Sequence, residues 1–450
     1  MKTEEKLNMT MLCDFYELTM GNGYFESGYK DHIPYFDVFF RRVPDGGGFA
    51  IAAGLEQLID YIENLHFSPE DIAYLRGRNL FSEEFLSYLE DFHFTGDIYA
   101  MPEGTPVFPR EPMVIVRAKA IEAQLIETFT LLTINHQSLI ATKANRIARA
   151  ARGRTVLEFG SRRAQGAEGA ILGARASYIA GCSATACTMA DQHYGSPATG
   201  TMAHSWVQMF PDEYTAFKTY CQLYPNNATL LVDTYNVLRS GVPNAIRAFK
   251  EVLEPLGVTK CGIRLDSGDL TYLSRKAREM LDEAGLTGCK IVASNALDEY
   301  IIRDLIRQGA RIDSFGVGER LITSRSEPVF GGVYKLSAIE DDQGHILPKI
   351  KISENPAKIT TPHFKKVYRI FSRDTGKAEA DLICVHDEEI DFTHPLELFD
   401  PAATWKRKVY TNIEARELLV PIFRGGELVY QVPELQTSRA KYESSSSYKN

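Results

Sequence analysis

Long apolar runs and an excess of basic residues are both missing from this 450-residue chain. The longest apolar segments fall far short of the roughly 20 residues that a membrane-spanning helix needs, so we expect no membrane protein. The formal net charge is -9, from 59 acidic and 50 basic residues. Because nucleic-acid binding depends on a basic surface that displaces counterions, we expect no nucleic-acid partner. A small anionic substrate is compatible with this balance, since it needs only a local group of arginines and lysines.

Cysteine is scarce as well. The seven cysteines are odd in number and include no Cys-x-x-Cys pair, which argues against a disulfide framework or a cysteine zinc site. The N-terminal segment is charged and lacks the apolar stretch of a secretion signal, so we expect a cytoplasmic location. The hydrophobic fraction of 44% and the charged fraction of 24% are typical of a globular protein. At this length we expect two or more domains.

The first 153 residues mix helices and short strands, which predicts the first part of an α+β domain. We expect helices at 10–27, 55–65, 69–92 and 119–151, and strands at 36–40 and between 97 and 118. The segment Ser68-Pro-Glu-Asp71 is typical of a helix start, with a capping hydroxyl, a proline and an acidic first turn.

From residue 154 to 330, short apolar strands alternate with helical segments. We predict strands at 155–159, 182–186, 198–202, 229–233, 261–266, 290–294 and 313–317. Several of them end in a polar or glycine-containing motif, as the strands of a β/α barrel do. Seven candidates for eight strands indicate an irregular β/α barrel, with a doubly wound parallel sheet as the alternative.

Residues 331–436 are strand-rich again and are expected to rejoin residues 1–153 in one split α+β domain. The predicted strands lie at 333–336, 350–352, 367–371 and 382–385. The last segment, 437–450, is rich in serine and is predicted to be a disordered tail.

The segment from Arg264 to Asp269 follows an apolar strand and carries the strongest motif. Asp266 and Asp269 suit ribose hydroxyls or a Mg²⁺ ion held in part through water. Arg264 is a planar donor for a carboxylate or phosphate, and Gly268, beside Ser267, lets the backbone approach a ligand closely. The alternative is an Asp-rich turn that caps the following helix.

The segment Glu158-Phe-Gly-Ser-Arg-Arg163 predicts a strand, a glycine turn and a helix of small residues. Arg162 and Arg163 can together hold a carboxylate and a phosphate. Phe159 can stack on an aromatic ring. The alternative is that the arginines form surface ion pairs and that Phe159 packs in the core.

Two further motifs follow predicted strands. His204 comes after Gly200 and Thr201 and can act as a nucleophile or general acid/base, with a structural histidine as the alternative. Gly316 and Gly318 can present backbone N–H groups to a phosphate near a helix start, with a packing turn as the alternative.

In this order, these segments resemble the nicotinate phosphoribosyltransferases, which belong to the type II phosphoribosyltransferases. The resemblance covers nearly the whole chain. Its motifs are Asp14-x-Tyr16, Phe159-Gly-Ser-Arg-Arg163, Gly200-Thr-x-Ala-His-Ser205, Val232-Asp-Thr-Tyr235, Arg264-Leu-Asp-Ser-Gly-Asp269, Ser294-Asn295 and Gly331-Gly-Val-Tyr-Lys-Leu336. It implies transfer of a phosphoribosyl group from phosphoribosyl pyrophosphate (PRPP) to nicotinate in NAD biosynthesis, with Mg²⁺ as cofactor and ATP as co-substrate.

The resemblance also implies a homodimer with shared active sites. Tyr16 from the neighbouring subunit and Phe159 would stack on opposite faces of nicotinate. His204 would be phosphorylated by ATP, and Arg264 and Asp266 would join it in catalysis. The other implied nicotinate contacts are Arg162, Thr201, Arg264 and Ser183. The implied PRPP and phosphate contacts are Arg163, Asp266, Ser267, Gly268, Asp269, Asn295, Gly316, Gly318 and Glu319, with Asp266 and Asp269 also holding Mg²⁺.

Two positions differ from those of relatives on the same scaffold. Ser183 stands where amide-using relatives carry an acidic residue, which favours anionic nicotinate over neutral nicotinamide. Glu319 replaces the hydroxyl residue of many relatives, so we expect it to orient Arg320 or a water in the phosphate pocket. Nicotinamide and quinolinate are alternative substrates, and a non-catalytic PRPP-binding regulatory barrel is the alternative from a different class.

Overall fold

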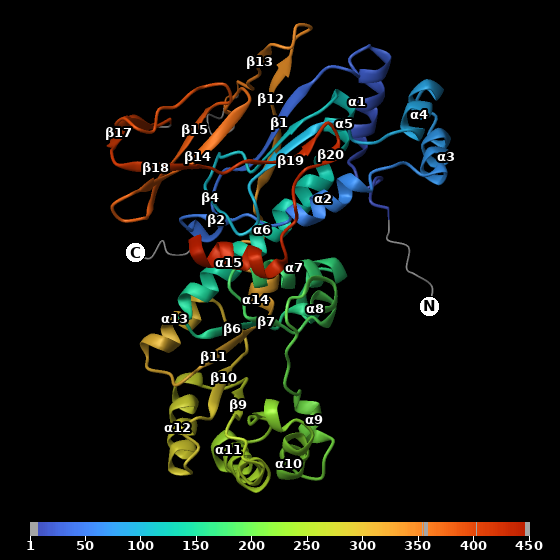
Figure 1. Ribbon diagram of the computed structural model, residues 1–450. Helices are drawn as coiled ribbons and strands as arrows, with labels where there is room; N and C mark the ends of the chain where they lie inside the picture. The colour runs from blue at the N-terminus through green and yellow to red at the C-terminus, as the bar shows by residue number, and fades with distance from the viewer. Residues whose placement is uncertain (1–7, 353, 355–358, 402, 446–450) are drawn as a thin grey trace. The chain divides into compact units, whose positions relative to one another are not determined.

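A computed structural model of the chain describes residues 8–352, 354, 359–401 and 403–445 (Figure 1). It divides into two compact units, of which unit 1 combines residues 1–138 with 329–450 and unit 2 comprises residues 139–328. The boundary therefore lies inside helix α6 (Glu127–Ala150) and not at residue 154. The helix is shared because Ser138 bonds to Ala53 of unit 1, whereas Lys143 bonds to Glu299 of unit 2.

Unit 1 is built on a sheet in which segments from both ends of the chain pair. Strand β1 (Pro34–Phe40) lies between β12 (Gly332–Glu340) and β5 (Val114–Arg117), antiparallel to both. The sheet order is β13-β12-β1-β5-β3-β19-β20. The remaining strands are β13 Ile346–Pro348, β3 Asp97–Ala100, β19 Val420–Arg424 and β20 Glu427–Leu428.

The helices of the N-terminal segment agree with the sequence pattern except at two breaks. They are α1 Phe15–Glu26, α2 Leu55–Glu63, α3 Pro69–Gly77, α4 Glu83–Glu90 and α5 Ala120–Leu125. The predicted helix start at Ser68 is confirmed, and it forms a full capping box, because Ser68 and Asp71 each accept a backbone N–H from the other. The single helix expected over 69–92 is wrong, since Asn79 adopts a left-handed φ of 52° that ends the helical path between α3 and α4. The helix expected over 119–151 is likewise divided, into α5 and α6, at Ile126.

The C-terminal part of unit 1 adds smaller antiparallel sheets. They contain β14 Lys365–Ser372, β15 Ala378–Val385 and β18 Ile413–Glu417, the hairpin β16 Leu396–Asp400 with β17 Ala403–Tyr410, and the pair β2 Ala50–Ile51 with β4 Pro106–Val107. The strand expected at 350–352 does not form.

The predicted disordered tail is wrong over much of its length, because residues Leu435–Ser445 form helix α15. Leu435, Ser438 and Tyr442 are buried at helical spacing, so one face of the helix packs on unit 1. A Cβ on Gly104 would lie 2.5 Å from the carbonyl oxygen of Ser438, which shows how closely the two segments pack. Residues 446–450 lie outside the described part of the chain.

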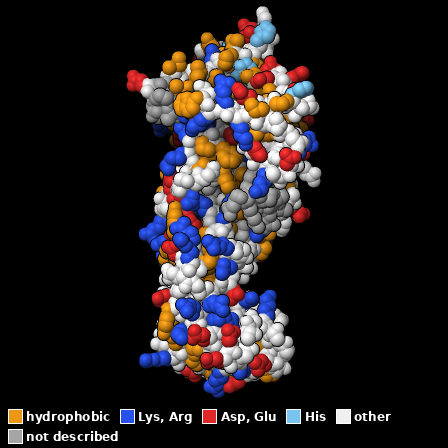
Figure 2. All heavy atoms as spheres, turned by 90° about the vertical axis from the view of Figure 1, so that its left-hand side faces the viewer, with side chains coloured by type: hydrophobic (Ala, Val, Ile, Leu, Met, Phe, Trp, Pro, Cys, Tyr) orange, Lys and Arg blue, Asp and Glu red, His pale blue; other side chains and the backbone are white. Residues whose placement is uncertain are grey.

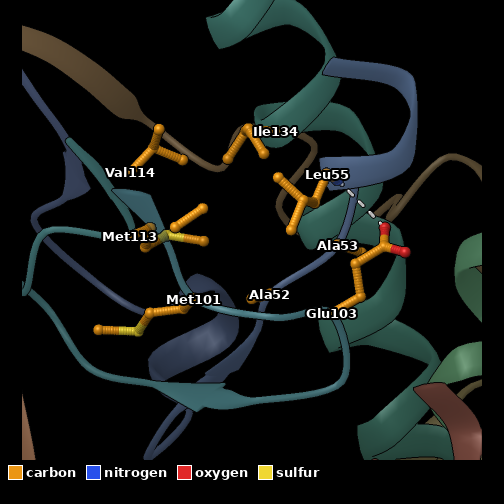
Figure 3. A pocket seen from close by; sticks show the side chains of 9 residues that line it. Ala52, Ala53, Leu55, Met101, Glu103, Met113, Val114 and Ile134 are labelled. Carbon is orange, nitrogen blue, oxygen red and sulfur yellow. Dashed lines mark hydrogen bonds between the residues drawn. The ribbon is translucent and has the colours of Figure 1, made fainter. Parts of the chain in front are cut away.

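A small apolar cavity lies inside unit 1 (Figure 3). Its lining includes Leu55, Met101, Met113 and Ile134, and its volume is about 10 Å³. Glu103 beside it accepts hydrogen bonds from the backbone N–H groups of Gly54 and Leu55, which fixes the start of α2. A space of this size holds at most one water, so this cavity is a packing feature and not a substrate site.

Unit 2 contains a six-stranded parallel sheet with the order β7-β6-β11-β10-β9-β8. The strands are β6 Thr155–Glu158, β7 Ala184–Thr185, β8 Thr229–Leu231, β9 Gly262–Leu265, β10 Lys290–Ala293 and β11 Ser314–Val317. The helices are α7 Ala167–Ile179, α8 Thr188–Tyr194, α9 His204–Gln208, α10 Glu213–Leu223, α11 Val242–Ala248, α12 Leu270–Glu283, α13 Glu299–Arg307 and α14 Glu319–Ile322. The mixed α/β fold is therefore confirmed.

Six of the seven strands predicted for this part of the chain are present. The segment 198–202 makes only an isolated bridge, between Ala198 and Thr185, so it extends the β7 edge by one pair. Within the described residues β7 and β8 are not paired with each other, so the sheet is open and does not close into a complete barrel.

The surface carries charges of both signs. In Figure 2, basic side chains are interspersed with acidic and hydrophobic ones on the face shown. Among the described residues, no helix has both the length and the apolar character needed to cross a bilayer.

A buried acid in unit 1 gives the fold a pH dependence. Burial, and next the neighbouring Asp381 carboxylate, raise the pKa of Glu111 to about 9. Arg369 donates to both oxygens of Asp381, at 2.8 and 2.5 Å, so the negative charge of the cluster is already matched by one cation. A second charge on Glu111 would have no such partner, and the protonated form is preferred.

We expect Glu111→Gln to gain stability relative to the wild type as the pH rises from 5 to 9. The contribution of protonated Glu111 is complete below its unfolded pKa and falls by up to about 1.4 kcal/mol per pH unit until the folded pKa is passed. Glutamine does not titrate and escapes this loss. Thermal unfolding midpoints of both proteins at pH 5 and pH 9 test this, with the exposed Glu63→Gln as control. A pH-independent difference would contradict the assignment.

Candidate active site

The candidate site lies on one face of the unit 2 sheet, at the carboxyl ends of its strands. In β9, the fully buried Ile263 and Leu265 face the helices, so the intervening Arg264 faces the other side. The strand registers pair Arg264 with Val292, and the next steps bring Asp266 and Ser294 to the same edge of the sheet. Side chains from adjacent strands that point to one face meet there, which is how parallel sheets build ligand sites.

Arg264 is the centre of this group. Its Nε donates to Ser294 Oγ at 2.9 Å, and its Nη2 donates to Asp266 Oδ1 at 3.0 Å. Its Nη1 donates to Thr201 Oγ1 at 3.2 Å and to the Met202 carbonyl at 3.4 Å. A guanidinium has five N–H groups, so one N–H on Nη2 is left for a ligand.

Asp233 supports the loop that follows β9. Its Oδ2 accepts hydrogen bonds from the backbone N–H of Asp266 at 2.9 Å and from Ser267 Oγ at 2.6 Å. Its side chain is 1% exposed, and its Oδ1 has no hydrogen-bond partner among the described residues. A buried carboxylate oxygen without a donor is costly, which indicates that a further donor or cation belongs beside it.

His204 stands opposite these carboxylates as the first residue of α9. Its Nδ1 is 3.0 Å from Thr234 Oγ1, and its Nε2 is 3.9 Å from both Asp233 Oδ1 and Asp266 Oδ2. The imidazole is 41% exposed. It is therefore oriented by a hydroxyl on one side, faces two acids on the other, and is open to a reagent from solution, as a nucleophilic histidine must be.

Phe159 lies beside Arg264, whose guanidinium carbon is 5.6 Å from the centre of the ring. The ring depends on two glycines. A Cβ at Gly316 would fall 2.6 and 2.8 Å from two ring carbons, and one at Gly318 would fall 3.1 Å from the Phe159 carbonyl. The packing alternative considered for these glycines therefore has a definite basis in the structure.

Arg162 and Arg163 lie in a short 3-10 helix, Ser161–Arg163, that follows Phe159. Both side chains are exposed, and neither has an ion-pair partner in the described part of the chain. The surface ion pairs considered as the alternative for them are therefore not formed within unit 2. The turn before them is held by Glu158, which accepts bonds from the Gly160 N–H and from Thr185 Oγ1, and burial raises the pKa of this carboxyl.

The loop after Asp266 has two functions. Gly268 adopts a left-handed φ of 79°, which turns the chain toward α12. Asp269 caps that helix through a 3.0 Å bond from the Tyr272 N–H, as the capping alternative expects. Asp266 is not a cap, and its carboxylate points into the site.

A cation would have to be shared with a ligand at this site. Among the described residues, no group of three or more histidines, cysteines or acids is arranged to hold a metal. Mg²⁺ is commonly held by one or two carboxylates together with substrate phosphates and waters. The partnerless Asp233 Oδ1, the partly buried Asp266 and the exposed Asp269 fit that mode.

The remaining phosphate candidates lie along the same edge. Asn295 is exposed and has a left-handed φ of 85°, followed by Ala296 at 47°. Consecutive left-handed residues without glycine are strained, and such strain often marks a functional turn.

The expected link between Glu319 and Arg320 is wrong. Glu319 instead pairs with Arg325 at 3.1 Å, because Arg320 is taken by the less exposed Asp298.

Two further predicted nicotinate contacts are Ser183 and Tyr16. Ser183 is exposed, and its N–H bonds to the Val156 carbonyl, in the first half of β6, whereas Phe159 follows the end of that strand. Tyr16 belongs to unit 1, where its side chain is 43% exposed. Burial and the neighbouring Glu127 raise the pKa of its phenol, so Tyr16 stays protonated.

Three contributors were missing from the sequence-based site: Asp233, Thr234 and Ser294. Each lies within three residues after the end of a parallel strand, β8 or β10, which is the signal that could have identified them. The sequence pattern includes Asp233 as a strand end but gives no reason to prefer it over other polar residues in that position.

Comparisons with known proteins are consistent along the whole chain. A family model described as the nicotinate phosphoribosyltransferase (NAPRTase) N-terminal domain matches residues 11–135, and one for the C-terminal domain of that enzyme matches residues 364–447. The nicotinate phosphoribosyltransferase of Bacillus subtilis (strain 168) is 48% identical over 428 residues, covering 95% of this chain and 86% of the relative. The Homo sapiens nicotinate phosphoribosyltransferase is 30% identical over 488 residues, covering 96% and 89%.

Solved structures resemble the chain as well. The crystal structure of human nicotinic acid phosphoribosyltransferase superposes with a TM-score of 0.84 at 28% identity, covering 96% of this chain and 93% of that one. Nicotinate-nucleotide pyrophosphorylase from Pyrococcus furiosus superposes with a TM-score of 0.74 at 22% identity, covering 99% and 97%, and shares the fold alone.

We expect Gly316→Ala to lower the stability of the protein by about 1–3 kcal/mol, because the added methyl group overlaps the Phe159 ring. Gly288→Ala is the matched control, since nothing lies within 4 Å of the Cβ it would add. Urea unfolding curves of the two variants and the wild type measure the effect. Equal midpoints for both variants would show that the ring does not need the space at Gly316.

Proposed function

The chain belongs to the nicotinate phosphoribosyltransferase family, and on that premise we propose that it transfers the phosphoribosyl group of PRPP to nicotinate in NAD biosynthesis. The products are nicotinate mononucleotide and pyrophosphate. The observation that best supports this is the cluster of Arg264, Asp266 and His204 on one sheet edge. It combines a cation for anionic substrates, a carboxylate for ribose hydroxyls and a histidine open to ATP.

The reaction needs positioning more than acid–base chemistry. The ring nitrogen of nicotinate carries no proton, attacks C1 of the ribose and forms the new C–N bond while the C–O bond to pyrophosphate breaks. The electron pair of that bond leaves with pyrophosphate, and positive charge develops on the ribose as in glycosyl transfer. The protein must therefore hold two anions in line and stabilise the developing charges.

The nicotinate side of the site is assigned to Phe159 and the nearby arginines. The ring of Phe159 supplies a flat surface, supported from the Arg264 side and made possible by Gly316. Arg162 is exposed one turn later and is free to bind the substrate carboxylate. The single N–H left on Arg264 would add one further bond, alongside the hydroxyl of Thr201.

The PRPP side is assigned to the ends of β9, β10 and β11. Asp266 would bind the ribose hydroxyls, and Ser267, Gly268 and Asp269 would continue that contact along the loop. Asn295, Gly316, Gly318 and Arg163 would receive the phosphates. Glu319, already paired with Arg325, would act on phosphate only indirectly. Mg²⁺ held by Asp266 and Asp269 would neutralise charge on the pyrophosphate leaving group when bound.

Coupling to ATP is assigned to His204. An unprotonated imidazole nitrogen attacks the γ-phosphorus, an N–P bond forms, the P–O bond to ADP breaks, and ADP leaves with that electron pair. Thr234 and the carboxylates of Asp233 and Asp266 hold the ring for this attack. Hydrolysis of the phosphohistidine in each cycle would then drive nucleotide synthesis.

The proposal keeps the dimer and barrel implied by the resemblance. In a homodimer with shared sites, the exposed Tyr16 of the neighbouring subunit would cover the second face of nicotinate, and the unit 2 sheet would form the wall of an irregular barrel. Ser183 retains its proposed influence on the choice between acid and amide through the absence of a carboxylate. Its backbone bond to Val156, in the first half of β6, places it away from the carboxyl end of that strand and makes that influence indirect.

We expect nicotinate, PRPP and Mg²⁺ to yield nicotinate mononucleotide, and ATP to raise the yield. Nicotinamide and quinolinate are assayed in parallel, and product is quantified by chromatography. Nicotinamide mononucleotide as the main product would overturn the specificity argument while preserving the reaction class. PRPP binding without turnover of any of the three pyridines would instead favour the regulatory barrel.

We expect His204→Ala to lose ATP stimulation and to keep part of the basal transfer, because Arg264 and Asp266 still hold the substrates. The exposed His193→Ala in α8 is the control and should behave as the wild type. Initial rates are measured with and without ATP, together with acid-labile ³²P incorporated from γ-labelled ATP. Stimulation of the His204 variant equal to that of the wild type would remove His204 from the coupling.

A further inference from the structure

We propose that Ser294 is a positioning residue of this site, which sets the orientation of Arg264 and Asp266 toward PRPP. The inference rests on the proposed function, in which those two residues contact the substrates. Ser294 is 3% exposed and follows the last residue of β10. Its hydroxyl accepts a hydrogen bond from Arg264 Nε at 2.9 Å and donates one to Asp266 Oδ1.

The direction of both bonds is fixed by chemistry. A guanidinium only donates and a carboxylate only accepts, so a hydroxyl between them must accept from the first and donate to the second. Because Arg264 Nη2 also donates to Asp266 Oδ1, the three groups close a ring of hydrogen bonds. The ring fixes the plane of the guanidinium and the rotation of the carboxylate together.

This ring decides which carboxylate oxygen faces the ligand. Asp266 Oδ1 is occupied by Arg264 and Ser294, whereas Oδ2 makes no hydrogen bond in the described residues and lies 3.9 Å from His204 Nε2. Without the hydroxyl, the carboxylate could rotate and exchange its two oxygens. Ser294 thus keeps Oδ2 available to the ribose hydroxyls and keeps the last free N–H of Arg264 in a constant direction.

The backbone of Ser294 is itself held firmly. Its N–H bonds to the Leu265 carbonyl at 2.9 Å, as part of the parallel ladder. The two residues that follow adopt left-handed φ values, so the chain turns away immediately after it. A Cβ at Gly316 would approach the Ser294 Cβ to 3.4 Å, and the Phe159 ring occupies the space that this glycine leaves. This arrangement supports a precise hydroxyl position.

The test compares Ser294→Ala with Ser294→Thr, which keeps the hydroxyl. Hydrogen bonds to charged groups are stronger than those between neutral groups. Losing the Ser294 hydroxyl in Ser294→Ala should therefore lower kcat/KM for PRPP by about 10- to 100-fold. Ser294→Thr should restore most of that loss. The matched control is Ser274→Ala in α12, a fully buried serine whose hydroxyl bonds only to backbone groups. Its unfolding midpoint should fall as much as that of Ser294→Ala while its kcat/KM stays at the wild-type value.

A double-mutant cycle tests whether Ser294 acts through Arg264. In an Arg264→Lys background the ring of hydrogen bonds is already broken, so Ser294→Ala should cost much less there than in the wild type. An unchanged kcat/KM in Ser294→Ala, or an equal loss in both backgrounds, would overturn the proposal. Failure of the wild type to turn over any pyridine would refute the proposed function alone. The effect of Ser294→Ala would then be measured by calorimetry as the Kd for PRPP. An unchanged Kd would overturn the positioning role of Ser294.

Discussion

The arrangement of the candidate site depends on one partly buried guanidinium. Arg264 projects from β9, which lies between β10 and β8 in a parallel sheet, where a cation without acceptors would be costly. Its acceptors come from three separate segments: Thr201 and Met202 after the β7 region, Asp266 at the end of its own strand, and Ser294 at the end of the next. Satisfying the charge therefore brings these segments together, and the binding surface is a consequence of that requirement.

Much of this fold could be predicted from the sequence because the parallel strands are apolar and short and end in polar residues. Strands β6, β8, β9, β10 and β11 were all predicted on that pattern. The pattern failed where a tertiary contact decides the structure. Helix α15 has the composition of a disordered tail, but it forms because Ser438 and Tyr442 are buried against unit 1. The break after α3 depends on one left-handed asparagine, Asn79, which no periodicity reveals.

The site shows the same division. Arg264, Asp266 and His204 could be chosen from residue type and position after a strand, and the structure brings them together. Ser294 and Asp233 stand in motifs of the resemblance but were given no role, because their importance comes from strand register and from the exact partners of a hydroxyl or carboxylate. Glu319 failed for a related reason, since the choice between Arg320 and Arg325 depends on a competing acid, Asp298, that is distant in sequence.

Electrostatic interactions link the two reactions proposed for the carboxyl-end edge of the unit 2 sheet, which are phosphorylation of His204 and phosphoribosyl transfer. A phosphoryl group on His204 would stand close to Asp233 and Asp266, whose carboxylate oxygens are 3.9 Å from the ring nitrogen. Two unit charges about 4 Å apart repel by about 4 kcal/mol at an effective dielectric of about 20, and solvent reduces this at a half-exposed imidazole. The repulsion is relieved by added positive charge, from the exposed Arg162 and Arg163 or from a cation bound with PRPP. Phosphorylation of His204 and binding of the substrate with its cation should therefore favour each other, since coupling between two sites is reciprocal. In the proposed cycle, this reciprocity is how the energy of ATP would reach a transfer reaction that needs no phosphoryl group of its own.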